Sequence, residues 1–452
     1  MNLRSLQWKE ILLLPAAGWT LTLVIVHQSI IASSSYFLTR LIEAFQSGRD
    51  FSPFLLAYLA AMLLPYIPGC ASLLTLQLWI NQAHRRFSNR LSESTYGFIE
   101  KHRDNSLRET IESVYSRNSF IALQDYLTFI YQFVSLILNS TLSMIVLSLL
   151  LPGNLIVGYT ISILGATTLI LLLRRRVYLR STQAENTFIS YSEALSQIWD
   201  NSVLGNRYNF DLWKQHRDRL ASQYYSRSNR LQLLKQSGNL TLAFLSLIPT
   251  VYLILSAIYR HGVESALIAA IIVNLTRVFH ILNSLSGLVY QILDFTAMNA
   301  RVQVLLNAER RFMEPTALPE APQGQVLVND SPVHQYESVV KVIRNSASGR
   351  FTIRGANGSG KSTLLHVLKK ALSSEAILVP SHHGKLQWRT TSANQSTGQR
   401  AVSQLLEISS HPEVRYLLLD EWDANLDAAN THAVDEILAQ FSENRVVIEI
   451  RH

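Results

Sequence analysis

The sequence predicts two structural parts, an all-α membrane domain of six long helices and a smaller C-terminal α/β domain. Three observations support this prediction. The 452-residue chain has 48% hydrophobic residues and a mean hydropathy of +0.14, which is too apolar for an ordinary soluble pair of domains. The apolar residues are concentrated in long uncharged stretches. Toward the C-terminus, short apolar runs alternate instead with helix-like stretches, as in an α/β fold.

Four stretches contain no Asp, Glu, Lys or Arg: 11–39, 51–83, 126–173 and 236–259. A helix needs roughly 20 apolar residues to cross a bilayer, so 126–173 fits two spans joined near residues 151–154. A sixth span is expected at 265–293, which only Arg277 interrupts. We expect no cleavable signal peptide, because the first apolar run is too long and has no clear small-residue cleavage site.

The net charge of +8 is attributed to membrane topology rather than to nucleic-acid binding. The basic segments "HRRFSNR" (84–90) and "RRRVYLR" (174–180) follow the second and fourth spans. Basic residues favour the cytoplasmic side, so both termini are expected in the cytoplasm of a multi-pass protein of the inner (plasma) membrane. Cys70 is the only cysteine, which excludes an intrachain disulfide.

Two polar segments, 84–123 and 176–235, are predicted to continue the membrane helices into water. Each contains a break suited to a short cross-piece: "KHRDNSLRET" (101–110), where Asp104 or Asn105 could cap a new helix, and "DNSVLGNRYN" (200–209), with a central glycine. Ordinary polar loops are the alternative, but structureless loops of this length are uncommon.

The predicted boundaries are a transmembrane domain at 1–312, a linker at 313–325 and a nucleotide-binding domain at 326–452. The linker, "MEPTALPEAPQGQ", holds three prolines and a glycine. Beyond it lie the apolar runs "QVLV", "SVVKVI", "RFTI", "EAILVP", "VRYLLLD" and "RVVIEI".

A phosphate-binding loop is predicted at "GANGSGKST" (355–363), between the strand "RFTI" and the helix-like "LLHVLKKAL". Its glycines let backbone N–H groups turn toward phosphate oxygens at a helix N-terminus. Lys361 is expected to reach the β and γ phosphates, and Ser362 to bind Mg²⁺. The predicted nucleotide-binding residues here are Gly355, Asn357, Gly358, Ser359, Gly360, Lys361, Ser362 and Thr363.

Two acidic residues end the apolar strand in "VRYLLLDEW" (414–422). Asp420 is expected to hold Mg²⁺ with Ser362, and Glu421 to act as the general base toward the attacking water. The predicted cofactors are therefore ATP and Mg²⁺.

A third motif makes the pattern specific. "QSTGQR" (395–400) lies between the phosphate loop and the acidic strand, and "ANLD" (424–427) follows that strand. This order resembles the ATPase of ABC transporters, whose usual signature is LSGGQ. Ser396, Gly398 and Gln399 match that signature, whereas Gln395 and Thr397 depart from it.

The resemblance implies a half-transporter of the exporter type that works as a homodimer. The signature would then contact the γ phosphate of ATP held by the partner subunit, and Asp427 would be the acid of the D-loop. The family also places a histidine after the next strand, where it helps to align the water. "VVIEIRH" puts His452 in that place. The alternative is a terminal histidine without a role.

The ATPase domain is unusually short for this family. The interval between Lys361 and Ser396 cannot hold the complete helical subdomain that normally grips the transmembrane cross-pieces. Ser381 stands where the Q-loop glutamine is expected, and Tyr336 is either the adenine-stacking residue or a core tyrosine. Two readings follow, a compact working ATPase or mainly a dimerisation clamp. The first is favoured because the catalytic groups are all retained: Lys361, Asp420, Glu421 and His452.

The resemblance favours ATP-driven export of a small peptide or peptide-like natural product, similar to bacterial peptide and siderophore exporters. The expected partners are a second copy of the chain, membrane lipid and this cargo, with no nucleic acid. A polar stripe in the sixth span would line the substrate cavity or pack a dimer: Arg277, His280, Ser284, Gly287 and Gln291. A lipid or drug exporter and a non-hydrolysing, nucleotide-switched membrane accessory protein are the alternatives.

Overall fold

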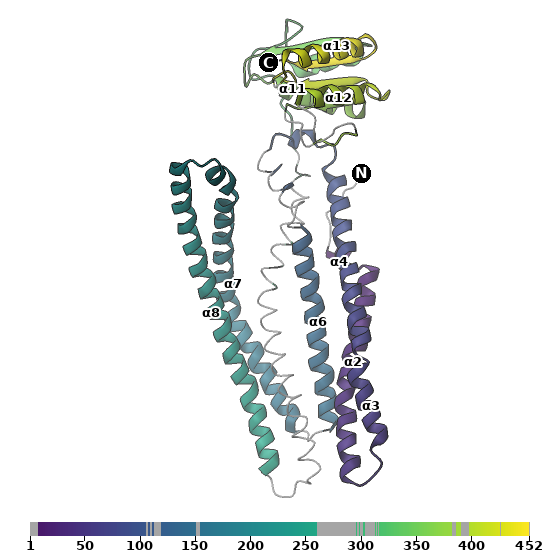
Figure 1. Cartoon of the computed structure of the whole chain (residues 1–452), viewed down its shortest axis with the longest axis vertical. Helices are drawn as coiled ribbons and strands as arrows, with labels where there is room; N and C mark the ends of the chain where they lie inside the picture. Colours follow the sequence, from purple (N-terminus) through teal and green to yellow (C-terminus); the bar gives the residue numbers. More distant parts are fainter. Residues whose placement is uncertain are drawn as a thin grey trace. The chain divides into compact units, whose positions relative to one another are not determined.

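A computed structural model of the chain describes residues 8–104, 107–108, 111–112, 119–150, 154–259, 316–381, 386–389, 397–424 and 426–451, together with residues 295, 298, 302, 312 and 314. The chain divides into two compact units (Figure 1). The helical unit comprises Met1–Ser94 and Thr110–Arg310, and the sheet unit comprises Thr95–Glu109 and Arg311–His452. The sheet unit therefore includes a segment that the sequence places between two membrane helices.

Helices account for most of the described part of the helical unit. They are α1 (Trp8–Leu12), α2 (Pro15–Gln46), α3 (Ser52–Leu63), α4 (Tyr66–Thr95), α6 (Ser119–Leu150), α7 (Asn154–Ser196) and α8 (Arg207–Tyr259). Local chemistry explains several ends. Pro15 occupies the first turn of α2, where its missing N–H costs nothing, and Gly48 follows that helix with φ 66°. Pro65 separates α3 from α4 because it cannot donate a helical hydrogen bond.

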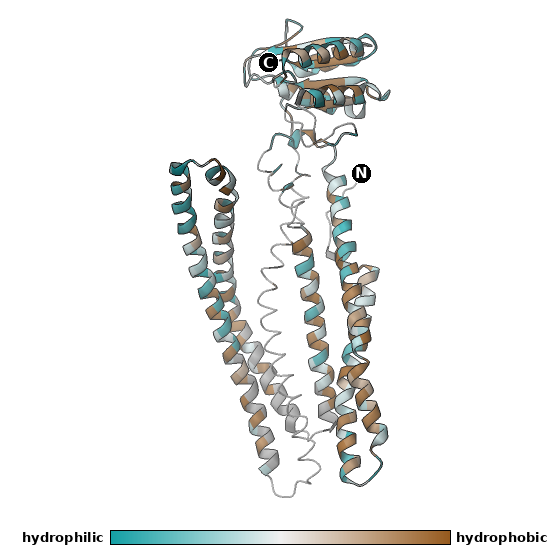
Figure 2. Cartoon of the chain, in the orientation of Figure 1, coloured by the Kyte–Doolittle hydropathy of each residue, from teal (hydrophilic) through white to brown (hydrophobic). Residues whose placement is uncertain are grey.

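Three helical stretches among the described residues are long and apolar enough to cross a membrane: Pro15–Gln46, Ser52–Thr95 and Ser119–Ser143. They coincide with the first three predicted spans. Large apolar side chains on α3 and α4 are exposed, including Leu63 and Leu74, as expected for a surface that contacts lipid. Figure 2 shows that many residues along these helices are hydrophobic. The predicted sixth span, with Arg277, His280, Ser284, Gly287 and Gln291, lies outside the described residues.

The helices also continue beyond the apolar stretches, as the polar segments predict. α7 runs on to Ser196 and packs along α8, whose N-terminal half is hydrophilic (Figures 1 and 2). A π-helix, η3 (Trp199–Val203), and Gly205 with φ 72° form the turn between them. At the other break, η1 (Ile99–Lys101) precedes Asp104, whose Oδ1 accepts a hydrogen bond from the Leu107 N–H at 3.0 Å. The predicted Asp104 cap is present.

The sheet unit contains a six-stranded sheet in the order β2-β1-β3-β6-β5-β4. Its strands are β1 (Val326–Val328), β2 (Ser331–Pro332), β3 (Gly349–Gly355), β4 (Ala376–Val379), β5 (Tyr416–Asp420) and β6 (Val446–Ile450). β3, β6, β5 and β4 are parallel, whereas β1 is antiparallel to both β2 and β3. The helices are α10 (Tyr336–Asn345), α11 (Lys361–Leu372), α12 (Thr397–Ser409) and α13 (Ala428–Asn444), with a short 3₁₀ turn, η4 (Ser373–Glu375).

Helices cover both faces of this sheet because its central strands are apolar on both sides. On β5, Leu418 packs with α10 and α11, and Leu417 and Leu419 pack with α12 and α13. All five residues of β6 are buried. Such two-sided burial is typical of parallel strands in α/β proteins. Between β4 and α12, the described residues 380–381 and 386–389 contain no helix.

Candidate nucleotide site

The site lies at the carboxyl edge of the sheet, where three parallel strands end together. β6 lies between β3 and β5, and the register pairs Ile450 with Ile353 on one side and with Asp420 on the other. The phosphate loop follows β3 and the two acids end β5. Ligands of open α/β sheets bind at this edge. The topology therefore brings the phosphate loop and the two acids to the same edge, on either side of the end of β6.

Glycines shape the phosphate loop for close approaches. Gly360 has φ 112°, and a Cβ atom there would lie 2.4 Å from the Tyr336 hydroxyl. A Cβ on Gly355 would lie 2.7 Å from the backbone oxygen of Gln325. Helix α11 then begins at Lys361, so its first unpaired N–H groups and the positive end of its dipole lie at the loop. This is the arrangement that binds phosphate.

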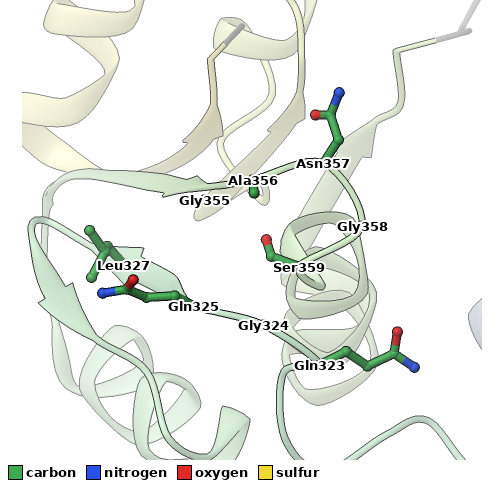
Figure 3. A pocket seen from close by; sticks show the side chains of 9 residues that line it. All are labelled: Gln323, Gly324, Gln325, Leu327, Gly355, Ala356, Asn357, Gly358 and Ser359. Carbon is green, nitrogen blue, oxygen red and sulfur yellow. The ribbon is translucent and has the colours of Figure 1, made fainter.

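A pocket of about 360 Å³ opens beside the loop (Figure 3). It is lined by Gln323, Gly324, Gln325, Leu327, Gly355, Ala356, Asn357, Gly358 and Ser359. Ser359 is only 5% exposed, and its hydroxyl points toward the pocket. This hydroxyl has no hydrogen-bond partner among the described residues. A buried hydroxyl without a partner is costly, so the pocket suits a ligand with acceptor oxygens such as phosphate.

Lys361 and Ser362 are held on either side of the first turn of α11. The Lys361 amine donates to the backbone oxygens of Gly355 at 2.8 Å and Ala356 at 3.3 Å, so it folds back over the loop. The Ser362 hydroxyl donates to Asp420 Oδ1 at 3.2 Å. The structure thus brings together the two predicted magnesium ligands.

The oxygen atoms of Ser362 and Asp420 suit Mg²⁺, which prefers hard ligands and keeps several waters. Burial raises the pKa of Asp420, and the Glu421 charge adds to this, although the Ser362 hydrogen bond and nearby cations work against it. No cluster of three or more His, Cys, Asp or Glu side chains occurs among the described residues. A cation here would therefore need phosphate oxygens and water to complete its shell.

Glu421 is held in an unusual backbone conformation directly after β5. Its φ is 48°, which is uncommon for a residue other than glycine, and its N–H donates to the Ile450 oxygen at 3.0 Å. The next residue, Trp422, donates its indole N–H to Glu449 Oε2 at 3.0 Å. Bonds to β6 therefore fix the backbone on which the predicted general base is mounted.

Glu449 is the centre of a charged network that the sequence analysis missed. Its side chain is only 1% exposed, and it accepts from Arg350 Nε at 2.8 Å and Nη2 at 2.9 Å. Arg451 Nε lies 3.1 Å from Glu449, and Asp435 accepts hydrogen bonds from both arginines. Burial opposes the charge of Asp435, but those two arginines lower its pKa overall. A glutamate inside the apolar run "VVIEI" was the available signal.

The signature residues show a different environment. Gly398 and Gln399 lie in the first turn of α12, while Ser396 lies outside the described residues. A Cβ on Gly398 would lie 2.4 Å from Asn430 Nδ2, so α12 and α13 approach closely there. Asp427 caps α13 by accepting from the Asn430 N–H at 2.8 Å and its side-chain amide at 2.9 Å.

The structure decides one of two further sequence hypotheses. Tyr336 is 1% exposed and donates to the Gly360 oxygen at 3.0 Å, so it is a core residue beneath the loop and not an adenine-stacking surface. His452 lies outside the described residues. Strand β6 ends at Ile450 on the edge that carries the acids, and Arg451 follows it.

Comparison with known proteins supports the predicted architecture. No protein-family model and no curated protein matches this sequence. A solved structure of a bacterial Atm1-family ABC exporter with ATP bound matches 97% of this chain and 90% of its own, with a TM-score of 0.61 and 13% identity. The chain has the fold of an ABC exporter. The prediction of a membrane helical region followed by a nucleotide-binding domain is confirmed at this level.

Proposed function

We propose that this chain is an ATP-driven ABC exporter that works as a homodimer. The observation that carries the proposal is the Ser362–Asp420 pair beside Glu421, at the sheet edge that also bears the phosphate loop. The loop with Ser362 and the acidic pair come from two distant parts of the sequence and take positions suited to one reaction. We assign the transmembrane domain to 1–312, the linker to 313–325 and the ATPase domain to 326–452.

The residues divide the work of hydrolysis. The loop amides and Lys361 bind the phosphates, and Ser362 and Asp420 hold Mg²⁺. Magnesium held there would supply positive charge that neutralises the phosphate oxygens as negative charge develops on them. Glu421 accepts a proton from water as the water oxygen bonds to the γ phosphorus and the bond to the β-phosphate oxygen breaks. ADP, phosphate and a protonated Glu421 result.

The second half of each site comes from the partner copy. In the ABC arrangement, Ser396, Gly398, Gln399 and Asp427 would close over the nucleotide of the other subunit, and His452 would help to align the water. Within one chain, Gly398 and Asp427 contact Asn430 rather than the phosphate loop. This placement supports an ATPase that completes its sites only as a dimer.

The proposed cargo is a small peptide or peptide-like natural product, exported across the inner (plasma) membrane with both termini cytoplasmic. The resemblance to half-transporters of this kind supports that cargo class. Arg277 and the polar residues on its helix face are the proposed cavity wall, since charged groups within spans normally face water or protein.

The test is ATP turnover by the purified protein in lipid nanodiscs, with and without a library of small peptides. Wild type should hydrolyse ATP and accelerate with a transported peptide, and Lys361→Ala should be inactive. ATP binding without hydrolysis would instead support a nucleotide-switched accessory protein. Stimulation by lipids or hydrophobic drugs alone would assign a different cargo, and failure to bind ATP would overturn the proposal.

A further inference from the structure

The segment 95–109, called here the cross-piece, packs within the sheet unit against the helix of the phosphate loop. Three contacts join it to α11. The Glu100 carboxylate lies 3.5 Å from the Lys370 amine. The rings of His102 and His366 meet edge to face, with centroids 5.3 Å apart. Arg103 Nη1 donates a hydrogen bond to the hydroxyl of Thr363.

The third contact reaches the phosphate loop motif itself. Thr363 lies in the first turn of α11, two residues after Lys361, and is 7% exposed. The charge of Arg103 also acts on Asp420, where it opposes the rise in pKa that burial causes. A guanidinium group that bonds Thr363 and influences Asp420 lies beside the proposed phosphate site.

Arg103 has the capacity to bind a further group. Its guanidinium carries five N–H donors, and Thr363 accepts from one of its nitrogens. The residue is exposed, and no carboxylate among the described residues forms an ion pair with it. Arginine binds phosphate through paired donors and keeps its charge at all physiological pH values, so a nucleoside triphosphate is a suitable ligand.

The neighbouring histidine does not compete for this role. His366 is 4% exposed, and burial, together with the charges of His102 and Arg103, lowers its pKa to about 4. It is therefore neutral at pH 7 and serves as a packing surface for His102. Arg103 is then the cation that the cross-piece presents to the first turn of α11.

We propose that Arg103 is a phosphate ligand of the nucleotide, supplied by the cross-piece between the membrane helices α4 and α6. This inference rests on the proposed ATPase function. It also gives a role to the direct contact between the cross-piece and α11. That contact matters because the interval between Lys361 and Ser396 is too short for a complete helical subdomain.

The experiment measures the affinity of the full-length protein in nanodiscs for fluorescent TNP-ATP, competed by ATP and by adenosine. Arg103→Ala should weaken ATP binding roughly 10- to 100-fold, because a hydrogen bond to a charged group is lost. Competition by adenosine, which lacks phosphate, should not change. Arg103→Lys should recover part of the loss. Lys101→Ala is the matched control, two residues away in the cross-piece, and should bind ATP as wild type does.

Two reference measurements keep the outcomes distinct. If Lys361→Ala fails to weaken ATP binding, the proposed function itself is wrong. If Lys361→Ala abolishes binding but Arg103→Ala equals wild type, only the role of Arg103 is overturned. A purely structural Arg103 would lower the unfolding temperature without nucleotide while leaving ATP affinity unchanged, and that result would also refute the inference.

Discussion

The sheet unit has a phosphate side, formed by the loop 355–363 with Asp420 and Glu421, and a signature side, formed by Gly398, Gln399 and Asp427. The two sides use their functional groups in opposite ways. On the phosphate side, Ser362 bonds to Asp420, two groups predicted to hold the same cation. On the signature side, Asp427 bonds to Asn430 and caps α13, and Gly398 leaves room for that same asparagine. On the phosphate side, the predicted functional groups bond to one another. On the signature side, they contact Asn430, a residue of the supporting helix α13. A single chain should bind nucleotide with its phosphate side, and the signature side should act only opposite a partner.

The largest effect should come from Lys361→Ala. The amine is the proposed phosphate-binding cation of the loop, so its loss should weaken ATP binding by roughly 100-fold and abolish hydrolysis and export. Membrane insertion should not change. TNP-ATP binding, phosphate release and cargo export can be compared at equal protein levels, and normal export would contradict the ATPase assignment.

Glu421→Gln should separate the two sides. The amide cannot accept the proton of water, so turnover should fall about 10²- to 10⁴-fold while ATP binding persists. The stalled protein should accumulate as a nucleotide-bound dimer, which native mass spectrometry can detect. Asp423→Asn, two residues further along, is the control and should retain turnover. Unchanged turnover in Glu421→Gln would mean that another group is the base.

Glu449→Gln should show that the phosphate side depends on buried support. Removing this charge leaves Asp435 as the one carboxylate partner of Arg350 and Arg451 among the described residues, which should lower the free energy of unfolding by about 3 kcal/mol. Turnover should also fall, because Trp422 loses a charged acceptor next to Glu421. Chemical denaturation and ATPase assays test both effects. Glu443→Gln, at an exposed position of α13, should change neither.

Gly398→Ala should affect only the signature side. The added methyl group meets the Asn430 side chain at 2.4–2.9 Å, so this side chain or α12 itself must move. ATP binding by one chain should remain. Turnover by the dimer should fall roughly tenfold, which corresponds to an increase of about 1.4 kcal/mol in the activation free energy of hydrolysis. Asn430→Gly in the same chain removes the clashing side chain and should restore part of the turnover. Equal loss of binding and turnover would erase the distinction between the two sides.

The smallest effect at neutral pH concerns His366. Its pKa is about 4 in the folded protein against 6.5 for the exposed group, so the unfolded state gains the proton first as the pH falls. Stability should be full above pH 6.5 and should decline from pH 6.5 to 4, by roughly 3 kcal/mol in total. His366→Leu should flatten this decline relative to wild type in urea unfolding curves. His432→Leu, on the exposed surface of α13, should not, and an unchanged slope in His366→Leu would contradict the assignment.

Local patterns were sufficient for the elements that hold the site. The glycines of 355–360, the apolar run before Asp420 and the cap at Asp104 each act within a few residues, so their structures follow from short-range sterics and hydrogen bonding. The first three membrane spans also follow from composition, because the bilayer sets their length.

Pairings between distant residues could not be predicted in the same way. Tyr336 could have been an adenine platform or a core residue, and only packing beneath Gly360 decided the matter. The role of Glu449 depends on Arg350 from another strand and on Trp422 from a following loop. A single glutamate in an apolar run gives no indication of which partners will neutralise it.

The sequence by itself determined the chemical groups of this protein: a glycine-rich loop predicted to bind phosphate, two acids predicted to hold metal and activate water, and apolar stretches long enough to cross a membrane. The tertiary structure alone decided that β6 lies between β3 and β5, and that the cross-piece joins the sheet unit rather than the helices beside it in sequence. The physical reason is that strand order and docking depend on burying apolar faces formed by residues far apart in the chain. Ser362 meets Asp420, and Arg103 meets Thr363, only after those faces have packed.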